Sequence, residues 1–225
     1  MSRVAKVPAG TRGFDANSVT TAVAASFAKA GYKFAVRYIR RDEVHPNDLS
    51  ALEIATLHNS GLAVMPVQHV ESEDCWRPTD DKGRQYGANA VDACRRLHLP
   101  TGVSVWLDLE GVAPDVDAEQ VIRYCNYWFG VVAAAGFSPG LYIGWSSRLT
   151  PQQLYDRLKF KCYWAAYNLN FDEYPAVRGV CMRQRAAKPG DTPTGVTFEI
   201  DTDTVQPDAF GGTPSAWAPD EWGIL

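Results

Sequence analysis

The sequence contains no run of 18 consecutive apolar residues, so it offers no ordinary transmembrane helix. Its formal net charge of −4 gives it no basic surface for nucleic acid or for an anionic membrane. The N-terminal segment MSRVAKVPAG is basic, but the apolar segment of a Sec signal does not follow it. We therefore expect a protein with no nucleic-acid partner and no membrane insertion.

Motifs for several chemistries are also missing. The four histidines lack HExxH or paired-ligand spacing, which argues against a metal site, and no GxSxG elbow provides a serine nucleophile. The five cysteines show no CxxC spacing, and their odd number favours free thiols over a disulfide framework. Free thiols indicate synthesis in a reducing compartment. The cysteines are Cys75, Cys94, Cys125, Cys162 and Cys181.

Short β-branched or aromatic segments alternate with helical stretches, which is the pattern of βα units. Hydrophobic residues make up 46% of the chain, enough for a substantial core. The predicted strands lie at residues 11–16, 34–39, 62–69, 103–110, 140–145, 162–167, 180–185 and 197–202. This pattern predicts an α/β fold: a single TIM-type (β/α)8 barrel whose last helices are short or missing.

The alternative is an open doubly wound sheet, which normally carries a Gly-rich phosphate-binding turn after an early strand. Residues 13–17, which read GFDAN, do not have that spacing. We assign residues 1–212 to the barrel. Residues 213–225 are expected to form an irregular C-terminal tail packed on the barrel.

The segment WLDLE ends the fourth predicted strand. Side chains alternate faces along a strand, so Trp106, Asp108 and Glu110 point one way while the intervening apolar residues suit the helix layer. Buried carboxylates are costly, and at the carboxyl end of a barrel strand they usually serve catalysis. The alternative is a structural pair of acids neutralised by Arg37 or another cation.

Two further acids end predicted strands, Asp15 the first and Asp201 the last, and these strands are neighbours in a closed barrel. Asp15 could instead belong to a turn or cap the helix beginning near Ser18. Asp201 alternates with Glu199 and Asp203 on one face, so all three could be solvated. Taken together with the fourth strand, these acids predict a catalytic group at the barrel mouth.

Two carboxyl groups in a partly desolvated cleft repel each other, so one stays protonated and can act as a general acid on a glycosidic oxygen. This chemistry needs neither a metal nor an organic cofactor. Sugar sites also use flat aromatic faces, although such residues equally belong to a core. His69 either lines the cleft or is an ordinary surface histidine. Substrate contacts are predicted for Arg37, Gln68, Tyr142, Trp145, Trp164 and Tyr167.

The segments GFDAN, VRYI, LAVMPVQHV, WLDLEG and FEIDTDT occur in this order from about Pro8 to Gly212. They resemble the glycoside hydrolase-like TIM-barrel family once described as a domain of unknown function, which is related to the family 25 glycoside hydrolase lysozymes. The most specific segments are GFDAN and WLDLEG.

The resemblance implies cleavage of peptidoglycan glycan strands at the β-1,4 bond between N-acetylmuramic acid and N-acetylglucosamine. It implies that Glu110 is the general acid/base and that Asp108 orients the substrate acetamido group in a retaining, substrate-assisted reaction. Asp15 and Asp201 would then be groove carboxylates. The rivals are a catalytically silent barrel that binds cell-wall glycan or a protein partner, and a hydrolase of another glycan.

The delivery route stays open. We expect a monomer made in the cytoplasm that reaches the cell wall by release through a holin, as a phage lysin does, or as a toxin of a contact-dependent secretion machine. In the second case an inhibitory immunity protein would be a further partner.

Overall fold

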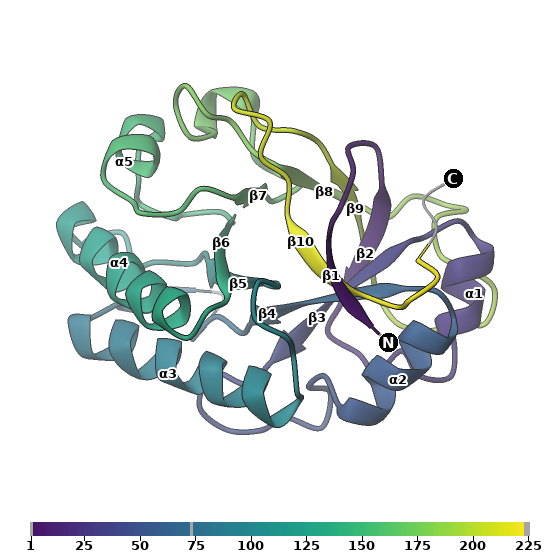
Figure 1. Cartoon of the computed structure of the whole chain (residues 1–225). Helices are drawn as coiled ribbons and strands as arrows, with labels where there is room; N and C mark the ends of the chain where they lie inside the picture. Colours follow the sequence, from purple (N-terminus) through teal and green to yellow (C-terminus); the bar gives the residue numbers. More distant parts are fainter. Residues whose placement is uncertain (1, 73, 223–225) are drawn as a thin grey trace.

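The computed structural model describes residues 2–72 and 74–222, and in them eight strands close into a barrel surrounded by five α-helices (Figure 1). Around the barrel the order is β4-β3-β2-β9-β8-β7-β6-β5, and β5 pairs again with β4. The predicted α/β barrel is therefore confirmed. The barrel strands are β2 (Arg12–Ala16), β3 (Phe34–Ile39), β4 (Ala63–Gln68), β5 (Ser104–Leu109), β6 (Ser138–Ile143), β7 (Tyr163–Ala165), β8 (Met182–Ala186) and β9 (Asp201–Val205).

Seven of these strands run parallel, but β9 is antiparallel to both of its neighbours, β2 and β8. Antiparallel neighbours need no helical crossover, and residues 187–200 join β8 to β9 without one. The missing late helix is thus as predicted. The predicted eighth strand at residues 197–202 is displaced, however, because Asp201 begins β9 instead of ending it.

The α-helices lie outside the barrel, and none in the described residues covers β8 and β9 (Figure 1). Polar side chains cap four of them at the N-terminus, as in the capping box of Thr150 with Gln153. Helices α3 and α4 approach closely because Gly83 faces α4, where an added Cβ would lie 2.5 Å from the carbonyl oxygen of Tyr124. The helices are α1 (Ala24–Lys29), α2 (Ala51–Asn59), α3 (Asp80–Arg96), α4 (Ala118–Ala134) and α5 (Pro151–Asp156), with a 3₁₀ turn η1 (Phe171–Glu173).

Two further strands lie at the end of the barrel where β4 and β5 begin. β1 (Arg3–Lys6) pairs antiparallel with β10 (Ser215–Ala218), and Trp217 of β10 pairs with Val64 of β4. β4 and β5 pair only near the end of β4, so β10 reaches the gap below, where the Ser215 N–H donates to Ser104 Oγ at 2.9 Å. The expectation of an irregular segment at residues 213–225 is therefore wrong for residues 215–218.

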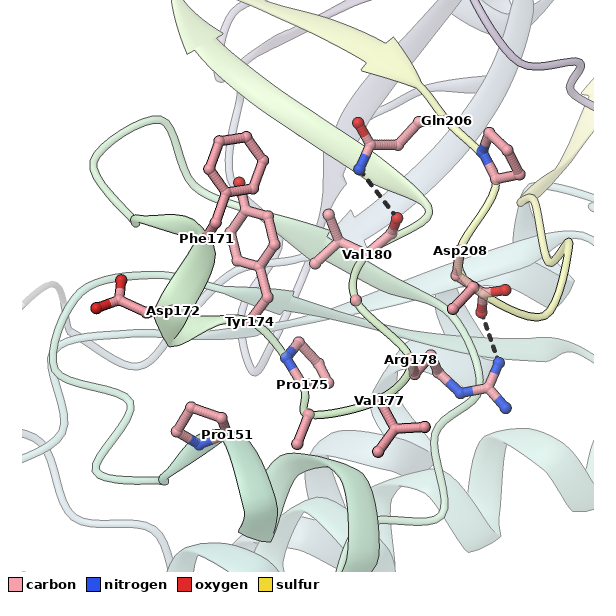
Figure 2. Close-up of a pocket in the computed structure, with 14 residues that line it drawn as sticks. Pro151, Phe171, Asp172, Tyr174, Pro175, Val177, Arg178, Val180, Gln206 and Asp208 are labelled. Carbon is pink, nitrogen blue, oxygen red and sulfur yellow. Dashed lines mark hydrogen bonds and ion pairs between the residues drawn. The ribbon is translucent and has the colours of Figure 1, made fainter.

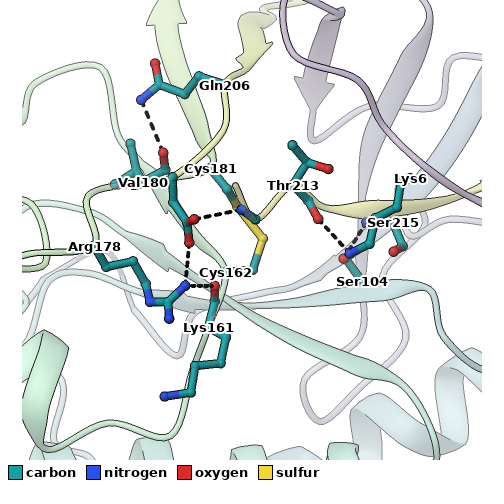
Figure 3. The surroundings of a disulfide bond; sticks show 12 residues. Lys6, Ser104, Lys161, Cys162, Arg178, Val180, Cys181, Gln206, Thr213 and Ser215 are labelled. Atoms are coloured by element: carbon teal, nitrogen blue, oxygen red, sulfur yellow. Dashed lines mark hydrogen bonds and ion pairs between the residues drawn. A yellow bond between two sulfur atoms is a disulfide. The ribbon is translucent and has the colours of Figure 1, made fainter. Parts of the chain in front are cut away.

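A disulfide joins Cys162 and Cys181 just before β7 and β8, with their Cα atoms 5.9 Å apart (Figure 3). The prediction of five free thiols is wrong, because the odd count hid one bonded pair between adjacent strands. Cys75, Cys94 and Cys125 are free, and burial raises the pKa of the Cys94 thiol to about 12. In the described part of the chain, no helix is both long enough and apolar enough to span a bilayer.

Candidate active site at the barrel mouth

The acids on and just after β2 and β5 that face the barrel interior influence the hydroxyl groups of the same two tyrosines. Tyr38 and Tyr142 are desolvated, which raises the pKa of both hydroxyl groups, and the charges of Asp15, Asp108 and Glu110 raise each of these pKa values further. Asp108 also pairs with Tyr142 in the register of β5 and β6, which agrees with these electrostatic effects. Asp15 and Asp108 are 5% and 3% exposed, whereas Glu110 is half-buried.

Glu110 follows the last residue of β5, and its backbone and side chain are both constrained. Its carbonyl oxygen accepts a hydrogen bond from Trp76 Nε1 at 2.5 Å. Its side chain lies directly over Gly144, where an added Cβ would come within 2.2 Å of Oε2. Gly144 therefore leaves the space that Glu110 occupies at the mouth.

Asp201 lies at the mouth for a reason different from the predicted one. Since β9 is antiparallel to β2, its first residue, Asp201, pairs with Asp15 near the end of β2. Directly opposed residues point to the same face, so both carboxyl groups face the barrel interior. Burial and the nearby charge of Glu199 raise the pKa of Asp201.

Asp203 is one layer deeper, opposite Gly13, and it is completely buried. The possibility that Asp201 and its neighbours are all solvated is thus wrong for Asp203. Burial raises the pKa of Asp203, and the adjacent charge of Asp15 raises it further. Neither carboxyl oxygen of Asp203 has a hydrogen-bond partner among the described residues, and two adjacent buried carboxylates repel each other, which favours a proton on one of them.

A hydrogen-bond chain extends from this acid pair across the barrel. Gln184 Nε2 donates to Asp15 Oδ2 at 3.0 Å, and the Tyr142 hydroxyl donates to Gln184 Oε1 at 3.0 Å. Burial raises the pKa of Asp15 to about 7, although the hydrogen bond from Gln184 opposes this shift. The chain fixes the orientation of Asp15.

Arg37 and Gln68 are not at the mouth. Arg37 is completely buried on the outer side of the sheet, where its Nε donates to Glu53 Oε1 at 2.8 Å. Gln68 is 1% exposed and binds the Tyr86 carbonyl oxygen and Trp128 Nε1. Both were predicted as substrate contacts, but their polar atoms are committed elsewhere, so this prediction is corrected.

The predicted aromatic residues divide into two groups. Trp164 is 1% exposed and packs between Trp106 and Tyr142, with ring centroids 5.7 and 4.5 Å away, so it belongs to the inner core and not to an open platform. Trp145 and Tyr167, in contrast, are 43% and 53% exposed in the loops after β6 and β7. The Gly111 N–H donates to the Trp145 carbonyl oxygen at 2.9 Å, so Trp145 is held beside Glu110.

Several functional candidates were absent from the sequence prediction. Tyr38 could have been found, because it follows Arg37 directly and so lies on the opposite strand face. The place of Asp203 depends on the antiparallel direction of β9, for which the sequence carries no local signal. Gly144 and Trp76 become candidates through their contacts with Glu110, which the sequence does not show.

A separate hollow lies away from these acids, among the loops before β8 and after β9 (Figure 2). It is lined by proline, aromatic and aliphatic side chains together with the Arg178–Asp208 ion pair, in which Nη1 and Oδ2 are 2.5 Å apart. It contains none of the predicted site residues.

The fold, with several acids at the strand ends, is an irregular TIM-type barrel of the kind found in family 25 lysozymes. A lysozyme from Streptomyces coelicolor has a TM-score of 0.59 at 12% identity, over 92% of this chain and 94% of that one. The autolysin LytC of Streptococcus pneumoniae, solved with a synthetic peptidoglycan ligand, has a TM-score of 0.61 at 11% identity, covering 87% of this chain and 46% of that one.

Residues 25–205 match the family described as Rv2525c-like, glycoside hydrolase-like domain, and the chain belongs to this family. The Tat-secreted protein Rv2525c of Mycobacterium tuberculosis, solved in complex with L-tartrate, has a TM-score of 0.64 at 17% identity. That likeness covers 93% of this chain and 100% of the other. No curated protein sequence matches this chain.

Proposed function

We propose that this barrel is an N-acetylmuramidase that hydrolyses the β-1,4 bond between N-acetylmuramic acid and N-acetylglucosamine in peptidoglycan. The observation that carries the proposal is the placement of Glu110. Its side chain lies over Gly144 at the mouth, and it affects the same two tyrosines as Asp108 and Asp15. A glycosidase needs such a carboxyl group beside a second one.

Glu110 is the general acid/base in this proposal, because it is half-buried and nearest the open end of β5. Asp108, deeper on the same strand face, orients and stabilises the substrate acetamido group. Asp15 and Asp201 line the groove. Trp145 and Tyr167 offer exposed aromatic faces for sugar rings, and Tyr142 places its hydroxyl between the two sides of the site.

A catalytically silent barrel that binds cell-wall glycan or a protein partner is the second candidate. The raised pKa values of Asp15 and Asp203 favour it, since a protonated acid adds no negative charge to the groove. An intact Asp108 and Glu110 pair favours the enzyme, because a binding module could replace either residue freely.

Action on the cell wall outside the cytoplasm agrees with the Cys162–Cys181 disulfide, because disulfides persist in oxidising compartments. The printed description of the relative Rv2525c as Tat-secreted agrees with it too. Peptidoglycan glycan strands are therefore the proposed partner, and the barrel is proposed to act as a monomer.

The test is digestion of purified sacculi followed by mass spectrometry of the soluble fragments. N-acetylmuramic acid at the new reducing ends is expected. N-acetylglucosamine at the reducing ends would identify a different glycosidase, and intact sacculi that retain bound protein would support the silent barrel.

A further inference from the structure

A second hollow opens among the loops that follow β2, β3 and β4, at the same end of the barrel as the acids Asp15, Asp108 and Glu110. It is lined by Asn17, His45, Pro46, Asn47 and His69. Among these five residues there is no acid, in contrast to the centre of the barrel. Two imidazoles and two side-chain amides provide N–H donors.

Asp48 holds the two histidines in place. Its Oδ1 lies 2.8 Å from His69 Nε2, and its Oδ2 accepts the backbone N–H of His45 at 2.8 Å. The Asp48 side chain is only 8% exposed and that of His69 16%. Because Nε2 of His69 is occupied by Asp48, Nδ1 is the ring atom left for a ligand, and it donates to an anion in the imidazolium form, in which both ring nitrogens carry a proton.

Arg37 holds the loops around the hollow together through hydrogen bonds to their backbone. Its Nη1 donates to the carbonyl oxygen of Ala16, and its Nη2 donates to that of Asn47 at 2.7 Å. Asn47 Nδ2 in turn donates to the carbonyl oxygen of Asn17 at 3.2 Å. The predicted substrate contact of Arg37 is thus replaced by a positioning role for the loops that line the hollow.

Tyr38 lies between the hollow and the acids at the centre of the barrel mouth. Its ring stacks on His69 with centroids 4.7 Å apart, and His45 meets His69 edge-on at 5.2 Å. The charges of Asp15, Asp108 and Glu110 raise the pKa of the same tyrosine. A sugar bound over Tyr38 would therefore span both places, with its substituents directed toward the histidines.

We propose that the hollow formed by Asn17, His45, Asn47 and His69 is a subsite for the carboxylate substituent of an acidic amino sugar. This inference rests on the proposed function and names the part of the substrate that the site distinguishes. The acids at the centre repel an anionic substituent, whereas N–H donors held by a buried carboxylate receive it. N-acetylmuramic acid carries such a carboxylate on its lactyl group, and N-acetylglucosamine does not.

The experiment compares two tetrasaccharides that differ only in the lactyl groups: the peptidoglycan tetrasaccharide of alternating N-acetylglucosamine and N-acetylmuramic acid, and chitotetraose. Calorimetric affinities are measured with Glu110→Gln, so that neither sugar is cleaved. We expect about tenfold tighter binding of the peptidoglycan tetrasaccharide, which is the size of one charge-assisted hydrogen bond.

Adding His69→Gln or His45→Gln to this background should reduce the preference to less than about twofold and leave the chitotetraose affinity unchanged. The exposed His98→Asn is the matched control and should retain the preference. His45 is exposed, so its variant remains informative even if His69→Gln fails to fold.

Equal affinity for the two sugars in the Glu110→Gln protein, no measurable binding of either, or a preference that survives both histidine variants would overturn the subsite. Cleavage of sacculi by wild-type protein decides the proposed function separately. Cleavage without a histidine-dependent preference keeps the enzyme and removes the subsite, and the reverse result keeps the subsite in a silent barrel.

Discussion

Asp203 lies beside Asp15 inside the barrel, completely buried opposite Gly13, and the pKa values of both carboxyl groups are raised, chiefly by burial. The pair lies below the mouth, and Gln184 connects it to Tyr142. It therefore makes both the stability of the fold and the charge of the groove depend on pH.

Stability should fall as the pH rises through neutrality, because the pKa of Asp15 is raised to about 7 and that of Asp203 is raised too. Between about pH 4 and pH 7 the native state keeps protons that the unfolded chain has released. For each such proton, the free energy of unfolding therefore falls by about 1.4 kcal/mol when the pH rises by one unit. Asp203→Asn should weaken this dependence, since an amide does not titrate in this pH range and does not repel Asp15. Urea denaturation at pH 5 and pH 8 measures the effect.

The variant should gain stability relative to wild type at pH 8 by more than at pH 5, and Asp81→Asn, at an exposed position, should behave like wild type. Parallel pH profiles for wild type and Asp203→Asn would show that Asp203 does not contribute to the pH dependence.

Gly144→Ala should displace the Glu110 side chain, since the new Cβ would lie 2.2 Å from its Oε2. A shift of about 1 Å in a catalytic group costs on the order of 100-fold in rate. We expect such a loss in the clearing of sacculi, with binding of peptidoglycan fragments retained. Gly130→Ala, where an added Cβ meets no atom within 4 Å, is the control and should be fully active. Full activity of Gly144→Ala would mean that the position of Glu110 is unimportant.

Arg37→Met should destabilise the protein by about 3–5 kcal/mol, because it leaves Glu53 charged and buried. Arg84→Met removes an exposed ion pair and should cost less than about 1 kcal/mol. Chemical denaturation of both variants gives the comparison. Similar values for the two would show that the Arg37–Glu53 pair contributes no more than a surface pair.

Reduction of the disulfide should destabilise the barrel by about 3 kcal/mol, since it closes a loop between residues 19 apart in sequence. Cys162→Ser with Cys181→Ser should show the same loss in the presence and absence of reductant. Cys75→Ser removes an exposed free thiol and should keep the wild-type response. A wild-type melting temperature that does not change with reductant would contradict a stabilising disulfide.

The barrel was predictable because alternation of strand and helix patterns is a local property. The inward direction of Trp106 and Asp108 followed from the period of two along a strand. The direction of β9 was not predictable, since the alternation of side chains along residues 197–205 is the same for a parallel and an antiparallel strand, and the role of Asp203 was lost with it. Arg37 and Gln68 were misplaced because strand position alone does not reveal which partners, here Glu53 and Trp128, lie outside the sheet.

The central claim is that Glu110 acts as a general acid on the glycan of peptidoglycan, and it is tested most directly by turbidity clearing of purified sacculi with wild type and Glu110→Gln. The account predicts a loss of about 100-fold or more with an unchanged or higher melting temperature, because Gln keeps the shape but cannot donate an acidic proton. Asp108→Asn should lose less, and the exposed Glu221→Gln should clear sacculi at the wild-type rate. Clearing by Glu110→Gln as fast as by wild type would contradict the account.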